Sequence, residues 1–171
     1  MFTNVEYLEF MWPMRHYLIT CGDIKNKSNI IALSFCMPVS NEPPLAAIAV
    51  GEKSLSYNFI NKYKEFIINV PLNNLKSKIY FCGMHSGNDM DKFKETGLTP
   101  MQAKIVKAPI IKECKAFMEC RVIDKIKTGD KYTFIGRVAE AYAESSALKI
   151  KESLDFAQGV FPVKIYGKRF K

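Results

Sequence analysis

Short apolar runs bounded by turn residues dominate the chain and indicate β structure. The runs are rich in β-branched or aromatic residues and stop at glycine, proline or another turn former, which is typical of strands. Four such runs predict strands at 15–20, 28–35, 45–50 and 65–70.

Two longer β-prone runs, 117–127 and 132–142, meet at Gly129 and Asp130 and predict a hairpin. Glycine accepts the positive φ that tight hairpin turns need. Arms of about ten residues are long for the strands of a sandwich and natural for a barrel.

The first arm of this hairpin alternates in polarity. Met118, Cys120 and Val122 are separated by the charged residues Glu119 and Arg121. Successive side chains of a strand point to opposite faces. We therefore expect the apolar residues of this arm to be buried, with Glu119 and Arg121 facing solvent.

Helical patterns are few and short. They occur at 54–63, 74–82 and 90–96, and the last stops at Gly97, a common residue after a helix end. The sequence therefore predicts a mainly β protein, an antiparallel barrel with short helical insertions, rather than a βαβ nucleotide fold. It lacks the glycine-rich Rossmann and P-loop fingerprints. Without an internal repeat or linker, residues 1–171 are expected to form a single domain.

The composition narrows the class of protein. With 48% hydrophobic and 12% aromatic residues, the chain can bury a sizeable core, which excludes intrinsic disorder. The longest apolar run, 45–50, is far shorter than the about 20 residues of a membrane span, and no signal peptide pattern is present. Five cysteines without a CxxC pair favour free thiols in a reducing cytoplasm and no metal site.

The charge is strongly positive. Lysine and arginine outnumber aspartate and glutamate by 25 to 17, a net charge of +8, which attracts anions of any kind. Most lysines alternate with glutamates, as on a solvated surface, and only the last eight residues form a purely basic cluster. A nucleic-acid partner is therefore not expected, although that basic tail keeps a polyanion-binding barrel as an alternative.

Three stretches expected to be loops combine small, hydroxyl and basic residues. The first is 29–40. The second, 53–58, places Lys53, Ser54 and Ser56 at the start of a predicted helix, where backbone N–H groups and the helix dipole attract anions. An ordinary serine N-cap is the commoner explanation of that pattern.

The third stretch, 82–93, carries Ser86, Gly87 and Lys92. A hydroxyl, a bare backbone and an ammonium in this order suit a phosphate. The alternative is a capped helix start, with Asn88 or Asp89 as the cap.

Taken together, the motifs resemble one family. The segments that carry the resemblance are residues 34–40 followed by 43–45, then 65–71, 82–87, 91–93, 97–99 and 108–114, and finally the hairpin from Gly129 to Gly136. From about Arg15 to Lys168, their order resembles the flavin reductase-like, FMN-binding split-barrel proteins, particularly the flavoredoxin and ferric-reductase branch.

The resemblance implies a split barrel that binds FMN at a homodimer interface. It places the edge of the flavin ring against the main chain of Ser34, Phe35, Cys36 and Met37. It assigns the phosphate to Ser56 with Lys53 or Ser54, and to Ser86, Gly87 and Lys92.

Three positions depart from the family pattern. Ser54 and Asn88 stand where arginine is frequent, and Lys53 and Lys92 are the candidates to compensate. Lys131 stands where many members have a histidine near the nicotinamide. Lys131 is therefore a catalytic candidate, and whether NADH or NADPH reduces the flavin directly is left open.

Cys36 is the second catalytic candidate because the resemblance places it beside the flavin ring. The favoured alternative is a small buried hydrophobic residue, since nothing in the sequence indicates a lowered thiol pKa.

The implied function is electron transfer from NAD(P)H or a protein donor through FMN to free flavin, ferric iron or a redox partner. A non-catalytic protein that stores or presents FMN is the alternative. The two differ in whether a bound flavin turns over with any acceptor.

Overall fold

The computed structural model describes residues 7–11 and 14–145, so the basic C-terminal cluster lies outside the described residues. Its main strands are β1 (Tyr17–Gly22), β2 (Ser28–Leu33), β3 (Cys36–Ser40), β4 (Leu45–Gly51), β5 (Glu65–Val70), β8 (Ala116–Thr128) and β9 (Lys131–Ala143). A small second sheet pairs β6 (Pro100–Met101) with β7 (Ile110–Ile111). The helices are α1 (Leu55–Tyr63), α2 (Lys76–Met84) and α3 (Lys92–Thr96), with 3₁₀ turns η1 (Tyr7–Met11) and η2 (Asn73–Leu75).

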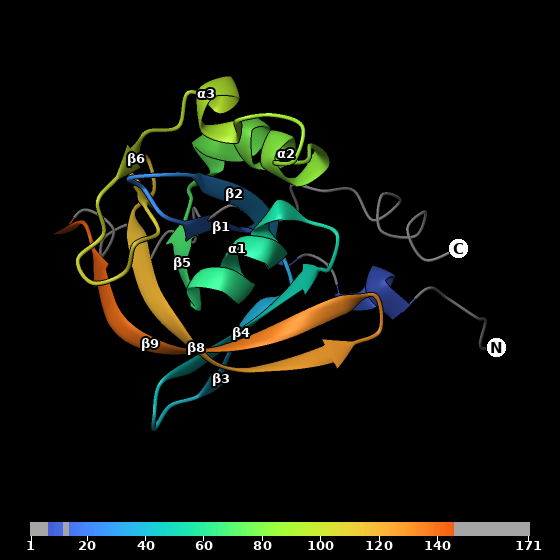
Figure 1. The fold of residues 1–171 in the computed structure, drawn as a ribbon. Coiled ribbons are helices and arrows are strands. Elements are labelled where there is room, and N and C mark those ends of the chain that lie inside the picture. Colours follow the sequence, from blue (N-terminus) through green and yellow to red (C-terminus); the bar gives the residue numbers. More distant parts are fainter. Residues whose placement is uncertain (1–6, 12–13, 146–171) are drawn as a thin grey trace.

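The seven main strands form one antiparallel sheet whose two edges meet. The strand order is β2-β1-β5-β8-β9-β4-β3, so β2 and β3 are opposite edges (Figure 1). Yet only Ser34 and Phe35 separate the end of β2 from the start of β3, so Leu33 and Cys36 lie roughly 10 Å apart at most. The sheet must therefore curl until its edges touch, and the Ala49 N–H donates to the Phe35 carbonyl at 3.0 Å across the junction. The predicted antiparallel barrel is confirmed.

Successive side chains of a strand point to opposite faces of the sheet, so the buried apolar residues form two clusters, one inside the barrel and one outside it. On β5, Phe66 and Ile68 pack inside the barrel with Phe134, whereas Ile67 between them packs outside. Helix α1 contributes Ile60 to the inner core. Helices α2 and α3 lie together over the outer face of the β1 and β2 region, as Figure 1 shows, and bury the outer core.

Local signals account for the helix ends. The Ser54 hydroxyl caps α1 by accepting from the Tyr57 N–H, and Gly97 ends α3 with φ of 63°. The predicted cap of α3, Asn88 or Asp89, is wrong. Asp91 takes that role because its carboxylate accepts from the N–H groups of Phe93 and Lys94.

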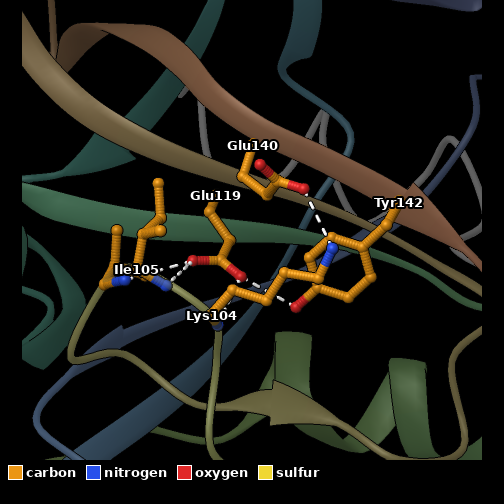
Figure 2. A network of polar contacts seen from close by, with 6 residues as sticks. Lys104, Ile105, Glu119, Glu140 and Tyr142 are labelled. Atoms are coloured by element: carbon orange, nitrogen blue, oxygen red, sulfur yellow. Dashed lines mark hydrogen bonds and ion pairs between the residues drawn. The ribbon is translucent and has the colours of Figure 1, made fainter.

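The long hairpin is confirmed, with β8 and β9 joined through Gly129 at φ of 63°. The expected exposure of Glu119 is wrong, since its side chain is fully buried. The register shifts between Glu119 and Cys120, and the Glu119 carboxylate accepts hydrogen bonds from the 104–106 segment and from the Tyr142 hydroxyl (Figure 2).

The strand predicted at 28–35 is confirmed, whereas the loop expected over 29–40 is wrong. Residues 28–33 belong to β2, and Cys36–Ser40 forms the edge strand β3, which pairs with β4. Only the Ser34-Phe35 link is irregular, because the chain there passes from one sheet edge to the other.

No helix in the part of the chain that the structure describes is long and apolar enough to cross a bilayer. The same residues contain no group of three or more His, Cys, Asp and Glu side chains arranged to hold a metal ion. All five cysteines are free thiols, and four of them are buried.

Candidate functional site

A cavity of about 330 Å³ lies beside the junction where the barrel closes. Four segments line it: the end of β2 with the Ser34-Phe35 link, the start of α1, the end of α2 with the loop after it, and the β8–β9 turn. Its volume falls in the range of small-molecule sites. Chain closure, rather than any one motif, brings these segments together.

One end of the cavity contains a buried cation. Lys92 is the first residue of α3 and is 3% exposed, and its Nζ donates to the Cys82 carbonyl at 2.8 Å. Burial lowers the pKa of Lys92 below its ordinary value. An ammonium has three N–H donors, and this carbonyl uses one of them. The side chain can therefore give two charge-assisted hydrogen bonds to an anion in the cavity.

The start of α1 adds hydroxyl and backbone donors. Ser54 Oγ accepts from the Tyr57 N–H at 3.1 Å and donates to the Gly51 carbonyl at 2.8 Å, so this serine is an ordinary helix N-cap. The N–H groups of Leu55 and Ser56 have no partner within the helix and lie at the cavity wall. The buried Ser56 Oγ accepts from Asn29 Nδ2 at 2.9 Å, which fixes its position.

The loop after α2 closes this end of the cavity. Ser86 Oγ accepts from the Asn88 N–H at 3.1 Å, and Asn88 Nδ2 donates to the Lys53 carbonyl at 3.2 Å. Gly87 packs directly on the Asn29 amide, and a Cβ there would overlap it. Asn88 thus ties the loop to the α1 segment.

The other end of the cavity is formed by the barrel junction and the hairpin turn. Lys131 Nζ lies 5.6 Å from the centre of the Phe35 ring and pairs with Asp130 at 2.6 Å. Ser34 Oγ is hydrogen-bonded to Nδ1 of the buried His16. Burial lowers the pKa of His16 to about 4, so the imidazole is neutral near pH 7.

The structure brings together most of the predicted site residues. Eight of them line the cavity: Ser34, Phe35, Ser54, Ser56, Ser86, Gly87, Lys92 and Lys131. Lys53 does not line it; this residue is exposed and reaches the site only through its carbonyl.

Cys36 and Met37 line a separate apolar groove of about 370 Å³. Burial raises the pKa of Cys36 to about 12, so the thiol is protonated near pH 7 and is a poor nucleophile.

Sequence reasoning missed Asn29 as a functional residue. It is 4% exposed, orients Ser56 and supports Gly87. Asn29 lies 27 residues before Ser56 and within an apolar strand, so no local pattern indicates the pairing.

Comparison with known proteins identifies the class to which this barrel and cavity belong. The profile of the flavin reductase-like domain family matches residues 12–162, and the chain belongs to this family. An uncharacterised protein of Archaeoglobus fulgidus is 35% identical over 78% of this chain and 75% of its own length. A flavin reductase of Pseudomonas putida is 29% identical over 78% of this chain and 75% of its own length. The crystal structure of a flavoredoxin from Methanosarcina acetivorans matches with a TM-score of 0.77 and 28% identity, over 85% of this chain and 76% of that one.

Proposed function

We propose that the cavity binds FMN and that the protein is an oxidoreductase of the flavin reductase or flavoredoxin type. In this proposal electrons come from NAD(P)H or a protein donor and pass to free flavin, ferric iron or a redox partner. The observation that carries it is the convergence of Lys92, Ser56, Ser86 and bare backbone at one end of a cavity of cofactor size.

The donor set suits a phosphate monoester. Two free N–H groups of the Lys92 ammonium, two serine hydroxyls and the first N–H groups of α1 all lie at the same wall. A dianion in this position gains charge-assisted hydrogen bonds and offsets the cost of burying the ammonium. The glycine at position 87 leaves room for the Asn29 amide, which holds the Ser56 hydroxyl in place at this end.

The other end suits a planar ring that changes its charge on reduction. FMN, when bound, supplies hydride and electron transfer at its ring, and the protein supplies position and electrostatics. The Ser34-Phe35 main chain and Phe35 ring would form one wall for that ring. Lys131 and its ion-pair partner Asp130 lie at the same wall, where they would face a substrate that approaches the ring from solvent.

The visible spectrum of the purified protein tests the proposal directly. We expect the absorption of an oxidised flavin that is bleached in anaerobic stopped-flow mixing with NADH or NADPH. If bound flavin is bleached only by a reduced protein donor, Lys131 in place of histidine has removed nicotinamide use. Bound flavin with negligible turnover on every acceptor supports the storage alternative, and failure to bind FMN after reconstitution overturns the proposal.

We further propose that the protein acts as a homodimer. The groove lined by Cys36 and Met37 is largely apolar, and Met37 and Val39 on the edge strand are 61% and 42% exposed. Exposed apolar side chains gathered at a sheet edge favour association. Light scattering of the purified protein distinguishes a dimer from a monomer.

Gly87→Ala is expected to weaken FMN binding about tenfold, a loss of about 1.4 kcal/mol. The new methyl group would overlap the Asn29 amide and displace it from Ser56 and from the phosphate end. Isothermal titration calorimetry with FMN measures the change. Gly51→Ala is the matched control, because Gly51 also lines the cavity and a Cβ there meets nothing within 4 Å. Equal affinities for the two variants would contradict the assignment of the phosphate to this end.

A further inference from the structure

Three hydrogen bonds fix the Ser34-Phe35 link, the wall against which the flavin ring would lie. The Ser34 carbonyl accepts from the Cys36 N–H at 2.8 Å, and the Phe35 carbonyl accepts from the Ala49 N–H at 3.0 Å. The third hydrogen bond joins the Ser34 hydroxyl to Nδ1 of His16. Of these three, it is the one that a side-chain substitution removes without changing the main chain.

His16 lies behind this wall. Ser34 lines the cavity, whereas His16 is fully buried and does not line it. His16 directly precedes β1, and Tyr17, the first residue of β1, pairs with Leu33 at the end of β2. One step further along the two antiparallel chains, His16 is opposite Ser34. The imidazole therefore reaches the link from the neighbouring strand, where it can orient Ser34 rather than touch a ligand itself.

The surroundings of the pair make this contact firm. Burial lowers the pKa of His16 to about 4, so the imidazole is neutral near pH 7 and brings no net charge to the wall. Ser34 is also buried, so neither group exchanges its partner readily for water. A hydrogen bond between two buried polar groups is costly to break, because each group then loses its partner without gaining solvent.

We propose that His16 is a positioning residue for the flavin, which through the Ser34 hydroxyl holds the Ser34-Phe35 main chain against the ring. The inference rests on the proposed function, because that function places the ring at this wall. Reduction adds electrons to the ring, and main-chain dipoles that are fixed in advance stabilise such charge better than mobile ones do. A link that His16 no longer holds should therefore lose more affinity for reduced FMN than for oxidised FMN.

The test measures the preference of the protein for reduced FMN, given by the ratio of the dissociation constants of oxidised and reduced FMN. Both constants come from titration of flavin-free protein, under anaerobic conditions for the reduced form. His16→Phe keeps a ring of similar shape but removes the partner of Ser34, and we expect it to lower this ratio about fivefold. Ser34→Ala removes the same hydrogen bond from the other side and should lower the ratio by a similar factor. The double variant should lose no more than either single variant, because His16 acts through Ser34.

Thr20→Val is the matched control. Thr20 is a buried residue of β1 whose hydroxyl donates to the Pro109 carbonyl, and it does not line the cavity. Its replacement also removes a buried hydrogen bond of a hydroxyl group near the start of the chain. We expect a lower free energy of unfolding and a ratio within twofold of wild type.

The ratio decides between a positioning role and a merely structural one. A ratio lowered by His16→Phe and Ser34→Ala, not lowered further in the double variant and unchanged by Thr20→Val supports the inference. A ratio that His16→Phe leaves unchanged, or effects that add in the double variant, or an equal change in Thr20→Val, overturns it. If His16→Phe does not fold, His16→Leu replaces it under the same criteria. All these outcomes leave the proposed function standing, whereas a wild-type protein that does not bind FMN overturns both.

Discussion

Lys92→Met is expected to lower the affinity for FMN about 100-fold, a loss of about 2.7 kcal/mol. Methionine keeps the length and apolar stem of the buried side chain but removes the ammonium that donates into the cavity. The loss is large because the site is shielded from water, where a hydrogen bond to a charged group contributes more than it does on the surface. Calorimetric titration with FMN measures it.

The same substitution is expected to leave the stability of the flavin-free protein within about 1 kcal/mol of wild type. Removing a buried charge is favourable, whereas leaving the Cys82 carbonyl without its donor is unfavourable, and the two effects oppose each other. Urea unfolding of both flavin-free proteins checks this. A variant that loses FMN only because it no longer folds would contradict the assignment.

Lys94→Met is the matched control for this substitution. Lys94 lies on the same short helix, and its side chain is exposed, away from the cavity. Its replacement removes one positive charge from the chain without removing a donor from the site. We expect FMN affinity to change less than twofold, so an equal loss in both variants would indicate a general effect of net charge.

The pH dependence of Lys92 follows from its buried position. Burial lowers its pKa in the folded state below the ordinary 10.5, so between those two values the unfolded chain binds more protons than the folded one. The contribution of Lys92 to the stability of the flavin-free protein therefore rises with pH across that window. FMN binding has the opposite trend there, because the phosphate requires the protonated side chain. Lys92→Met should lack both trends.

The elements that the sequence predicts well are those with local causes. The strand 65–70, the turn at Gly129 and the helix end at Gly97 each follow from neighbouring residues, and the structure contains all three. The site was predictable to the extent that hydroxyls and lysines marked the 53–58 and 82–93 segments. Closure of the barrel then places eight of the predicted residues on one cavity.

The features that the sequence did not predict have causes distant in the chain. Asn29 is polar within an apolar strand because Ser56 and Gly87 meet it there. Cys36–Ser40 becomes a strand because β4 offers it an edge. Glu119 breaks the alternation of β8 because a loop of 104–106 presents three N–H groups to it. In each case the partner that decides the conformation lies too far along the chain for a local pattern to contain it.

Glu119→Ala is expected to destabilise the protein by about 3–4 kcal/mol. The carboxylate accepts from the N–H groups of Lys104 and Ile105, each at 2.8 Å, and of Val106 at 3.1 Å, and from the Tyr142 hydroxyl at 2.8 Å (Figure 2). Alanine leaves these donors without an acceptor beside the outer core, and each unsatisfied buried donor costs about 1–3 kcal/mol, less where the loop relaxes to water. Urea unfolding measures the change.

Two further variants separate the hydrogen bonds from the charge. Glu119→Gln keeps the shape but turns one accepting oxygen into a donor that faces other donors, so we expect an intermediate loss of about 2 kcal/mol. Glu140→Ala removes the exposed ion pair between Glu140 and Lys104 in the same network and should cost less than about 1 kcal/mol. If Glu119→Ala costs no more than Glu140→Ala, the buried carboxylate does not hold the 104–106 segment.

The pH dependence provides an independent check on the role of Glu119. Burial raises the pKa of Glu119, but the hydrogen bonds from the 104–106 N–H groups and Tyr142 favour the charged form more strongly and leave the pKa below its ordinary 4.5. Between these two values the unfolded chain binds more protons than the folded one. The stabilisation is therefore complete above the unfolded pKa and is lost as the pH falls through the folded pKa. In unfolding curves taken from pH 7 downward, wild type should lose stability more steeply than Glu119→Gln across this acid window, and parallel curves would show that another carboxylate dominates.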